Sequence, residues 1–559
     1  MARSKRPAAV RSLADVDRLV GKMTLDQKVG QCMTLAYYGT TISQEVIERI
    51  EELHCGGLRV TPHVNSSGRL DVVRRLAPYY TPAQYAETLN ELQRIAAARP
   101  LGLPLHMVTD QEGDLSVDYL HGVELFPSQM GLTATGSPAL ARRCARQVAR
   151  QLRAAGIHMI HSPVLDVNIN PRNPEIGCRS FSNSPERCAT YGEAFMKGLA
   201  DGGIIATGKH FPGRGDSAVD AHHTLPVLRA SRRRLDAVEL FPYRALIPKG
   251  LPAVMTAHNA YPALDPSALP ASISRRIVTG VLRGELGFDG VVTTDAMSMG
   301  GLVSICPTPE GCARAIAAGN DLVLVKECDD QPREAFAAIK RYVQSGRIPD
   351  AQLDASVRRI LAMKLRYGLF SGRYVDPAGA QAACVDRATV SAAKDVARKC
   401  LTRVRDRKRR LPLSPKRKIL VLLPVQILYH EKGNDLEHDP IRLYHAIRRH
   451  APDAELFEFA APDTPADVIR HAVKRAAEFD VVVALSMVWR QAPICHKMIR
   501  RVIRAGRKVV VVSNNNYDAD ALGGAETLLV TYSAMPRSMD AAADALFGRL
   551  QPGGIEPLV

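Results

Sequence analysis

Four side chains that can hold or transfer protons gather in a short segment of the chain that begins at Lys209. His210 follows directly, and Asp220 and His222 come later in an Asp-x-His arrangement. This spacing lets the carboxylate bind the imidazole and stabilise its charged form, which suits general acid–base chemistry. The alternative is a solvated loop whose histidines occur by chance. A further carboxylate, Asp295, follows an apolar run later in the chain and argues against that alternative.

The residues in front of Lys209 predict the element that positions this segment. An apolar run at residues 203–207 indicates a buried strand, and the glycines and proline after His210 indicate a loop. Loops at strand ends of α/β proteins often carry chemistry on a rigid scaffold.

The same pattern, a short apolar run followed by an amphipathic helical stretch, recurs over the first two thirds of the chain. Strands are predicted at 31–35, 57–60, 105–109, 158–163, 203–207, 253–257, 291–294 and 321–325, with helices between most of them, such as 82–98, 138–155 and 185–201. Eight strands that alternate with helices over this length predict a (β/α)8 barrel, or TIM barrel.

Polar residues follow the carboxyl ends of several predicted strands. Asp110, Asp166, Lys209, His258 and Asp295 all occupy such positions. Because barrel enzymes build their active sites at this face, the pattern predicts both the fold and a catalytic site.

A second unit follows the predicted barrel. Helical segments at 350–367 and 386–405 and a basic run at 403–418 lead to strands at 418–423, 455–459, 481–485, 508–513 and 527–531. We predict a catalytic barrel at 1–370, a helical and basic linker at 371–417, and an α/β sandwich with an open, mostly parallel sheet at 418–559. The first strand lacks a glycine-rich loop after it, so a nucleotide site is not expected.

Composition excludes several classes of protein. The formal charge is +17, but the basic residues are mostly spread among acidic neighbours, so nucleic-acid binding is not expected as the main function; an anionic glycan or cell-envelope surface suits the charge better. The eleven cysteines are scattered and indicate neither disulfides nor a zinc site, and no cofactor or metal is expected. No membrane span or secretory signal is evident, which predicts a cytoplasmic protein. The oligomeric state stays unknown.

Three ordered stretches carry distinctive motifs. Residues 168–181 read Asn-Ile-Asn-Pro-Arg-Asn-Pro-Glu-Ile-Gly-Cys-Arg-Ser-Phe, residues 209–222 read Lys-His-Phe-Pro-Gly-Arg-Gly-Asp-Ser-Ala-Val-Asp-Ala-His, and residues 291–299 read Val-Val-Thr-Thr-Asp-Ala-Met-Ser-Met. Together they resemble glycoside hydrolase family 3, and within it the β-N-acetylglucosaminidase (β-N-acetylhexosaminidase) branch. The branch's patterns are Asn-Pro-x-Asn-Pro-x-Ile-Gly-x-Arg-Ser-Phe and Lys-His-Phe-Pro-Gly-x-Gly-Asp-x-x-x-Asp-x-His, followed by the nucleophile strand.

The resemblance implies a retaining glycosidase, which forms and then hydrolyses a covalent glycosyl-enzyme. Asp295 is then the nucleophile, and His222 is the acid/base with Asp220 as its support. From the residues alone, Asp295 can also cap the next helix. His223 falls one residue outside the Asp-x-His spacing, and His258 is left open between support of the site and a place in the core.

The resemblance also implies the residues that bind the sugar. Asp110 would accept hydrogen bonds from sugar hydroxyls, while Arg179, Lys209 and His210 would donate to sugar oxygens. For Arg179, a buried ion pair with Asp166 is the alternative.

One stretch departs from the branch's pattern of Asp-x-Glu-Gly-Gly followed by arginines. Asp114 replaces the second glycine, and Leu115 and Asp118 stand where basic residues are usual. Asp118 takes the place of an arginine that contacts substrate. We therefore expect a reversed charge at one edge of the pocket and an altered preference for cell-wall fragments. The alternative is that Asp118 points into solvent or pairs with a neighbouring arginine.

The expected activity is release of terminal β-linked N-acetylglucosamine, or hydrolysis of a related β-glycoside. A β-glycoside phosphorylase is an alternative, because a histidine acid/base repels phosphate less than a carboxylate does. A catalytically inactive glycan-binding protein is a third reading, against which Asp295, Asp220 and His222 argue together. The second domain is expected to be mainly structural.

Overall fold

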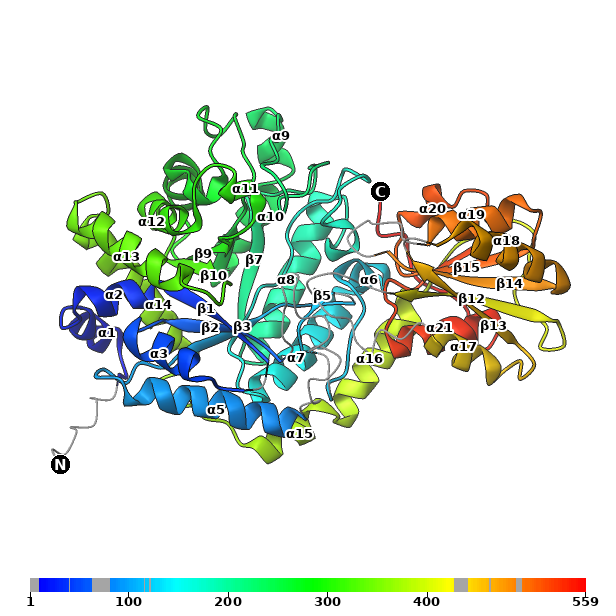
Figure 1. Ribbon diagram of the computed structural model, residues 1–559, viewed down its shortest axis with the longest axis horizontal. Coiled ribbons are helices and arrows are strands. Elements are labelled where there is room, and N and C mark those ends of the chain that lie inside the picture. The colour runs from blue at the N-terminus through cyan, green and yellow to red at the C-terminus, as the bar shows by residue number, and fades with distance from the viewer. Residues whose placement is uncertain are drawn as a thin grey trace.

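The computed structural model describes residues 10–39, 41–62, 81–114, 116–119, 122–426, 441–461, 464–488 and 495–559. Residues 1–9, which belong to the segment that lacks the pattern of a secretory signal, and Leu115 lie outside these ranges. Figure 1 shows two units side by side: a barrel from the blue-to-green part of the chain, and a layered sheet from its yellow-to-red part.

Eight parallel strands close into a barrel in which each strand pairs with the next one along the chain. They are β1 (Met33–Tyr38), β2 (Gly57–Thr61), β3 (His106–Thr109), β6 (Met159–Ile160), β7 (Ile205–Phe211), β8 (Ala253–Thr256), β9 (Val291–Ala296) and β10 (Leu322–Val325). β1 and β10 complete the circle, with Met33 opposite Val323 and Leu35 opposite Val325. All eight predicted strands are present, and the predicted (β/α)8 barrel is confirmed.

Helices surround the barrel (Figure 1). Those between strands are α3 (Gln44–Glu52), α5 (Pro82–Ala98), α6 (Gln129–Ala134), α7 (Pro138–Ala154), α8 (Pro185–Asp201), α9 (Arg232–Ala237), α10 (Phe241–Leu246), η4 (Arg276–Glu285), α11 (Gly300–Val303) and α12 (Thr308–Ala318). Before β1 lie α1 (Leu13–Val20) and α2 (Leu25–Gln31), and after β10 lie α13 (Gln331–Gln344) and α14 (Asp350–Arg366). None of the helices in the described ranges is both long and apolar enough to cross a bilayer.

The three helices that directly precede β3, β6 and β7 in the chain begin in the same way. Thr81, Ser137 and Ser184 each accept a hydrogen bond from a backbone N–H in the first turn of α5, α7 and α8, and a proline follows each of them. A hydroxyl cap followed by proline is a strong helix start, because proline lacks the N–H that would otherwise stay unpaired. The local sequence therefore fixes where the loops at the carboxyl ends of the preceding strands end and these helices begin.

The second unit is a mixed sheet between two layers of helices. Its strands are β11 (Thr402–Asp406), β12 (Ile419–Gln426), β13 (Glu455–Ala461), β14 (Val481–Ser486), β15 (Val509–Ser513) and β16 (Thr527–Val530), in the order β11-β16-β15-β14-β12-β13. In Figure 1, α18 (Ala466–Arg475), α19 (His496–Arg504) and α20 (Asp518–Ala521) lie on one side, and α17 (Ile441–Arg448) and α21 (Pro536–Leu546) on the other. All pairs are parallel except β11 with β16, so the predicted α/β sandwich is confirmed.

The basic run at 403–418 is not simply the linker that we expected. Helices α15 (Pro377–Cys384) and α16 (Arg387–Cys400) lead into β11, which pairs antiparallel with β16 from Thr402 to Asp406. The alternating arginines hid this strand, because only one side of an edge strand is paired and charged side chains there are common. The bounds of the domains stay a prediction.

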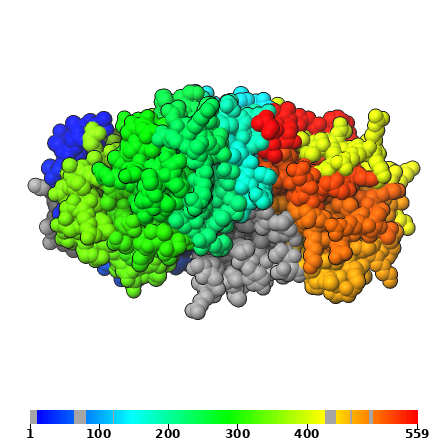
Figure 2. Space-filling view, turned by 90° about the horizontal axis from the view of Figure 1, so that it is seen from above, coloured from blue at the N-terminus to red at the C-terminus, as the bar shows by residue number. Residues whose placement is uncertain are grey.

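The turn after β15 joins the second sheet to the barrel. Asn514 donates to the carboxylate of Asp114 at 3.1 Å, and Asn168 donates to the hydroxyl of Tyr517 at 2.6 Å. The last residues also return to the barrel: Ile555 N–H donates to the carbonyl of Ala134 at 2.8 Å, and in Figure 2 the red end of the chain lies against the cyan part of the barrel. The loops that follow β3 and β6 are thus held from outside the barrel.

Candidate active site

A pocket opens at the carboxyl ends of the barrel strands, on the face that the sequence predicted. Six of the residues predicted for the site line it: Asp110, Arg179, Lys209, His210, His222 and Asp295. Asp220 is bound directly to His222, so the structure brings the whole predicted set together. Arg59, Glu112, His161 and Arg214 also line the pocket and were not predicted.

Asp295 lies near the end of β9, and only 16% of its side chain is exposed. Its Oδ1 accepts a hydrogen bond from the backbone N–H of Ala296 at 2.8 Å, and its Oδ2 lies 3.4 Å from Nη1 of Arg214. Burial opposes the charge, but Arg214, the neighbouring histidines and the N–H of Ala296 together outweigh burial and hold the pKa of Asp295 well below its usual value. Asp295 therefore presents a carboxylate, rather than a carboxylic acid, to the pocket at neutral pH.

The predicted Asp-x-His pair is formed. Nδ1 of His222 lies 2.7 Å from Oδ1 of Asp220, and that oxygen also accepts the backbone N–H of His222 at 2.7 Å. The carboxylate thus fixes the orientation of the ring and favours a hydrogen on Nδ1. His223 is exposed and is not among the residues that line the pocket.

Two glycines hold the segment that carries His222 against the start of α11. The N–H of Gly300 donates to the carbonyl of His222 at 3.0 Å, and that of Gly301 donates to the carbonyl of Ala221 at 2.8 Å. A Cβ on Gly300 would lie 2.5 Å from the backbone of His223. This close approach requires glycine, and it sets the position of the imidazole relative to β9.

Lys209 is the centre of a buried network on the other side of the pocket. Its Nζ lies 3.0 Å from Oδ1 of Asp110 and 2.6 Å from Oε1 of Glu112. Arg179 donates two parallel hydrogen bonds to Glu112, at 2.7 and 2.8 Å. Burial opposes the charge on Glu112, but Arg179 and Lys209 lower its pKa to about 2. The alternative of an ion pair between Arg179 and Asp166 is therefore not what the structure contains.

His210 lies inside a strand, because β7 continues to Phe211 and does not end at 207 as predicted. Its Nδ1 lies 2.6 Å from Oδ2 of Asp166, and its Nε2 lies 2.8 Å from Nη2 of Arg214. A guanidinium only donates, so Nε2 is the acceptor and Nδ1 carries the hydrogen. Burial, followed by the charge of Arg214, lowers the pKa of His210 well below its usual value. A neutral His210 in this arrangement has no N–H left for the sugar, contrary to our expectation.

The expected charge reversal at Asp118 is wrong, and the alternative, a pair with an arginine, is what the structure contains. Asp118 is buried, its Oδ2 lies 2.5 Å from Nη2 of Arg59, and it accepts the backbone N–H of Asp110 at 2.9 Å. Arg59 also binds the other side of Asp110, at 2.7 Å from its Oδ2. A cation on β2 thus neutralises the carboxylate that replaces the usual basic residue. Because Arg59 sits within an apolar run far away in sequence, the motif gave no sign of it.

His258 belongs to the core beneath the site. It is fully buried, with Nδ1 2.7 Å from the hydroxyl of Ser272 and Nε2 3.0 Å from the carbonyl of Ala296. Burial lowers the pKa of His258 below its usual value. Its role is to support the end of β9, directly after Asp295.

One set of side chains with metal-ligand chemistry lies close together within the described ranges. The ligand atoms of Glu175, Asp220 and His222 all lie within 4.8 Å of one another. However, Nη1 of Arg214 already lies 3.3 Å from Oε1 of Glu175, and the Nδ1 of His222 faces both carboxylates. Arg214 and His222 therefore already place positively charged or N–H-bearing groups next to the carboxylates of Glu175 and Asp220.

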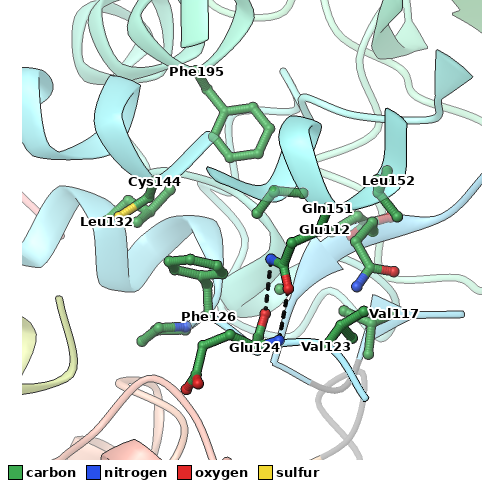
Figure 3. Close-up of a pocket in the computed structure, with 14 residues that line it drawn as sticks. Glu112, Val117, Val123, Glu124, Phe126, Leu132, Cys144, Gln151, Leu152 and Phe195 are labelled. Carbon is green, nitrogen blue, oxygen red and sulfur yellow. Dashed lines mark hydrogen bonds between the residues drawn. The ribbon is translucent and has the colours of Figure 1, made fainter. Parts of the chain in front are cut away.

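A second pocket lies behind Glu112 (Figure 3). The hairpin of β4 (Gln111–Gly113) and β5 (Ser116–Val117) forms one side, and α7 and α8 contribute mainly apolar side chains. Gln151 and the backbone of Glu124 exchange two hydrogen bonds, at 2.7 and 3.2 Å. Glu112 reaches this wall but is bound by Arg179 and Lys209. This pocket is therefore packing behind the hairpin, and the chemistry lies in the first pocket.

Comparison with known proteins agrees with this geometry. Residues 24–363 match the model of the glycosyl hydrolase family 3 N-terminal domain. A β-N-acetylglucosaminidase/β-glucosidase of Cellulomonas fimi is 31% identical over 421 residues, which cover 74% of this chain and 70% of that protein. A β-hexosaminidase of Pseudomonas aeruginosa is 35% identical over 249 residues, which cover 44% of this chain and 73% of that protein.

Solved structures resemble both units together. A family 3 β-N-acetylglucosaminidase from Paenibacillus sp. str. FPU-7 superposes with a TM-score of 0.87 at 32% identity, and the match covers 96% of this chain and 99% of that one. A β-glucoside phosphorylase superposes with a TM-score of 0.81 at 23% identity, covering 98% of this chain and 96% of that one. The latter likeness shows the fold alone.

Proposed function

Because the chain belongs to glycosyl hydrolase family 3 and is a glycosidase, we propose that it releases terminal β-linked N-acetylglucosamine, or a related β-linked sugar, with retention of configuration. The observation that carries this proposal is the pairing, in one pocket, of an ionised Asp295 with a His222 whose Nδ1 is bound by Asp220. A retaining mechanism needs a nucleophile and a group that gives and then takes one proton.

In the first step a carboxylate oxygen of Asp295 attacks the anomeric carbon while the bond from that carbon to the leaving oxygen breaks. Asp220 engages Nδ1 of His222, so the proton that passes to the leaving oxygen comes from Nε2. In the second step a water molecule gives a proton to Nε2 and its oxygen displaces Asp295 from the anomeric carbon. The imidazolium and the free carboxylate of Asp295 are then restored.

The network of Lys209 is proposed to bind the non-reducing sugar. Asp110 is the partly exposed member, and it is held on one side by Lys209 and on the other by Arg59. Cationic partners on both sides fix the orientation of this carboxylate, as an acceptor for sugar hydroxyls requires. Arg179 faces the same pocket with its Nε and Nη2 bound to Glu112. These roles follow the family motif and the geometry.

Phosphorolysis is less well supported than hydrolysis. A phosphate acceptor needs positive charge that is not already balanced by carboxylates. Lys209, Arg59 and Arg179 each have a carboxylate partner within 3.0 Å, and Arg214 lies 3.4 Å or less from Asp295 and Glu175. The combination of nucleophile and acid/base likewise disfavours an inactive glycan-binding protein.

We propose a cytoplasmic location on the chemistry of the cysteines. All eleven are free thiols, and most of them are buried as small apolar side chains. Reducing compartments favour this usage.

The function is tested with 4-nitrophenyl β-glycosides of N-acetylglucosamine and of glucose, each with and without phosphate. We expect the first substrate to be turned over faster, the free sugar to appear first as its β-anomer by NMR, and phosphate to leave the rate unchanged. Release of a sugar 1-phosphate would establish the phosphorylase instead. No turnover of any β-glycoside would overturn the proposal, with Asp295→Asn as the blank.

A further inference from the structure

Glu175 is a fully buried carboxylate beside the proposed acid/base, and no motif specifies it. It stands at an open position of the pattern Asn-Pro-x-Asn-Pro-x-Ile-Gly that residues 170–177 follow. Its backbone is fixed by Asn173, whose side-chain oxygen accepts the N–H groups of Glu175 and Ile176, each at 2.9 Å. Asn173 also donates to the carbonyl of Arg214 at 2.7 Å. These hydrogen bonds therefore fix the position of Glu175 in the loop.

Its two oxygens contact the segment that carries the acid/base. Oε1 lies 3.1 Å from Nδ1 of His222, and Oε2 accepts the backbone N–H of Ala221 at 3.3 Å. The Nδ1 of His222 thus faces two carboxylates, Asp220 at 2.7 Å and Glu175 at 3.1 Å. Asp220 lies in the same segment as His222, whereas Glu175 comes from the loop after β6.

Glu175 also connects this segment with the nucleophile. Nη1 of Arg214 lies 3.3 Å from Oε1 of Glu175 and 3.4 Å from Oδ2 of Asp295. One guanidinium thus lies between the carboxylate that faces the acid/base and the carboxylate that attacks the sugar. Burial opposes the charge of Glu175, but Arg214 and His222 hold its pKa below the usual value.

We propose that Glu175 is a positioning residue that acts through His222: together with Asp220 it holds the imidazole ring and stabilises the imidazolium on which both proton transfers depend. This inference rests on the proposed function. The charged groups around His222 are Asp220, Glu175 and Asp295, which favour its protonated form, and Arg214, which opposes it. Loss of one negative charge at 3.1 Å makes the imidazolium less stable.

The rival explanation is that Glu175 only neutralises Arg214. In that case its loss would disturb Asp295 and slow every substrate alike. A role through His222 predicts a different signature, because proton donation limits only substrates with poor leaving groups. It also predicts a change in the pH profile, because His222 loses its proton at a lower pH once the second carboxylate is gone.

The test is Glu175→Gln, which keeps the shape and removes the charge. We expect kcat/KM for an alkyl β-glycoside to fall about 10- to 100-fold, with a smaller loss for 4-nitrophenyl glycosides. The alkaline limb of the kcat/KM profile should move down by about one pH unit. KM should change little, and glycosyl-enzyme should accumulate with the activated substrate.

Asp321→Asn is the matched control, because Asp321 is another buried carboxylate held by arginines, Arg283 and Arg359, but does not line the pocket. It should leave the alkaline limb in place. Glu175→Asp keeps the negative charge but withdraws it by one methylene from both His222 and Arg214, which contact the same oxygen, so it should shift the limb part of the way. It also keeps the inference testable if the glutamine variant does not fold.

An unshifted alkaline limb in Glu175→Gln, with equal losses for alkyl and aryl substrates, would overturn the inference and leave the proposed function standing. Failure of the proposed function shows separately, as undiminished activity of Asp295→Asn in the same assay.

Discussion

The carboxylate of Asp114, in the barrel, accepts a hydrogen bond from the backbone N–H of Ala534, in the second unit, at 2.8 Å. Asn514 donates to the other oxygen of Asp114 at 3.1 Å. Asp114 has a φ of +46°, in the left-handed region, and it follows Gly113, whose Cβ would lie 2.3 Å from the carbonyl of Pro127. The hairpin that carries Glu112 is therefore tied to the second unit at a position where glycine would fit the backbone.

Asp114→Gly should loosen this contact without backbone strain. We expect a loss of about 1–3 kcal/mol in unfolding free energy, because two hydrogen bonds to a buried carboxylate disappear. KM should rise more than kcat falls, since the hairpin positions the carboxylate that holds Lys209 and Arg179. Urea unfolding and steady-state kinetics measure both effects. Asp114→Asn tolerates the same φ and keeps an acceptor for Ala534, so an equally large loss in that variant would contradict this account.

Asp295→Asn should lower turnover by at least about 10³-fold with little change in stability, since the amide cannot form the glycosyl ester. The pKa of Asp295 lies below its usual value, so this carboxylate stays charged from neutral pH down to below pH 4. An acid limb of kcat/KM between pH 5 and 7 must then come from another group. An acid limb that moves in the Arg214→Lys variant would contradict the conclusion that a group other than Asp295 causes it.

His222→Ala should slow alkyl glycosides far more than activated aryl glycosides, because a good leaving group departs without a proton. With the activated substrate, glycosyl-enzyme should accumulate and be visible by intact-protein mass spectrometry. His223→Ala is the matched control, since His223 is exposed and outside the pocket lining. If the two variants exchanged behaviour, the assignment of the acid/base would be wrong.

Asp118→Arg should destabilise the barrel and should not improve the use of anionic substrates. The new arginine would place a second guanidinium against the buried Arg59. In the parent protein, Oδ2 of Asp118 lies 2.5 Å from Nη2 of Arg59 and balances its charge. Breaking a buried ion pair typically lowers the unfolding free energy by about 3–5 kcal/mol. Thermal unfolding tests this, with Asp118→Asn as the milder variant. A folded Asp118→Arg enzyme that prefers anionic glycosides would restore the interpretation based on the motif.

We expect the protein to become less stable in mild acid because of two buried histidines at the base of the barrel. His106 and His158 are fully buried, and burial holds the pKa of each well below its usual value, so both stay neutral when folded. Once unfolded, they take up protons below about pH 6.5, which favours the unfolded state by up to about 1.4 kcal/mol per pH unit for each group. The stabilisation that comes from keeping these two histidines neutral is complete above about pH 6.5 and is lost as the pH falls. Urea unfolding at pH 7.5, 6 and 5 should show the decline.

His158→Asn is a suitable comparison, because an amide oxygen can accept the N–H of Met107 that Nδ1 of His158 now accepts at 3.2 Å. This variant should show a shallower decline between pH 6 and 5 than the parent. An unchanged slope would mean that other groups cause the acid sensitivity.

The sequence predicted the parts of the site that depend on short-range order. The apolar runs located the barrel strands, the end of one run located Asp295, and two-residue spacing identified Asp220 with His222. The charge partners were not predictable in this way. Arg59 reaches Asp110 and Asp118 from β2, and such pairings depend on which strands become neighbours in space.

Two strands, β7 and β11, differ from the prediction because charged residues interrupt the apolar pattern that indicates a strand. The polarity of Lys209 and His210 favours the start of a loop, yet β7 continues through both residues, since positions at the mouth of a barrel can be polar when paired. β11 was not predicted because its arginines resemble a solvated run. Charged residues are thus accommodated in β7 by pairing with opposite charges and in β11 by its place at the edge of the sheet.

The pairing of β1 with β10 has a consequence for how the molecule forms. Met33 and Val323 come from opposite ends of the barrel sequence, so closure is among the most non-local events in folding, and such topologies fold slowly. Until β10 arrives, β1 and β9 each present an open edge of buried, apolar strand, which favours association with other chains. We therefore expect yields on refolding to depend on concentration, and binding of a sugar analogue to return only after the circle of strands is complete.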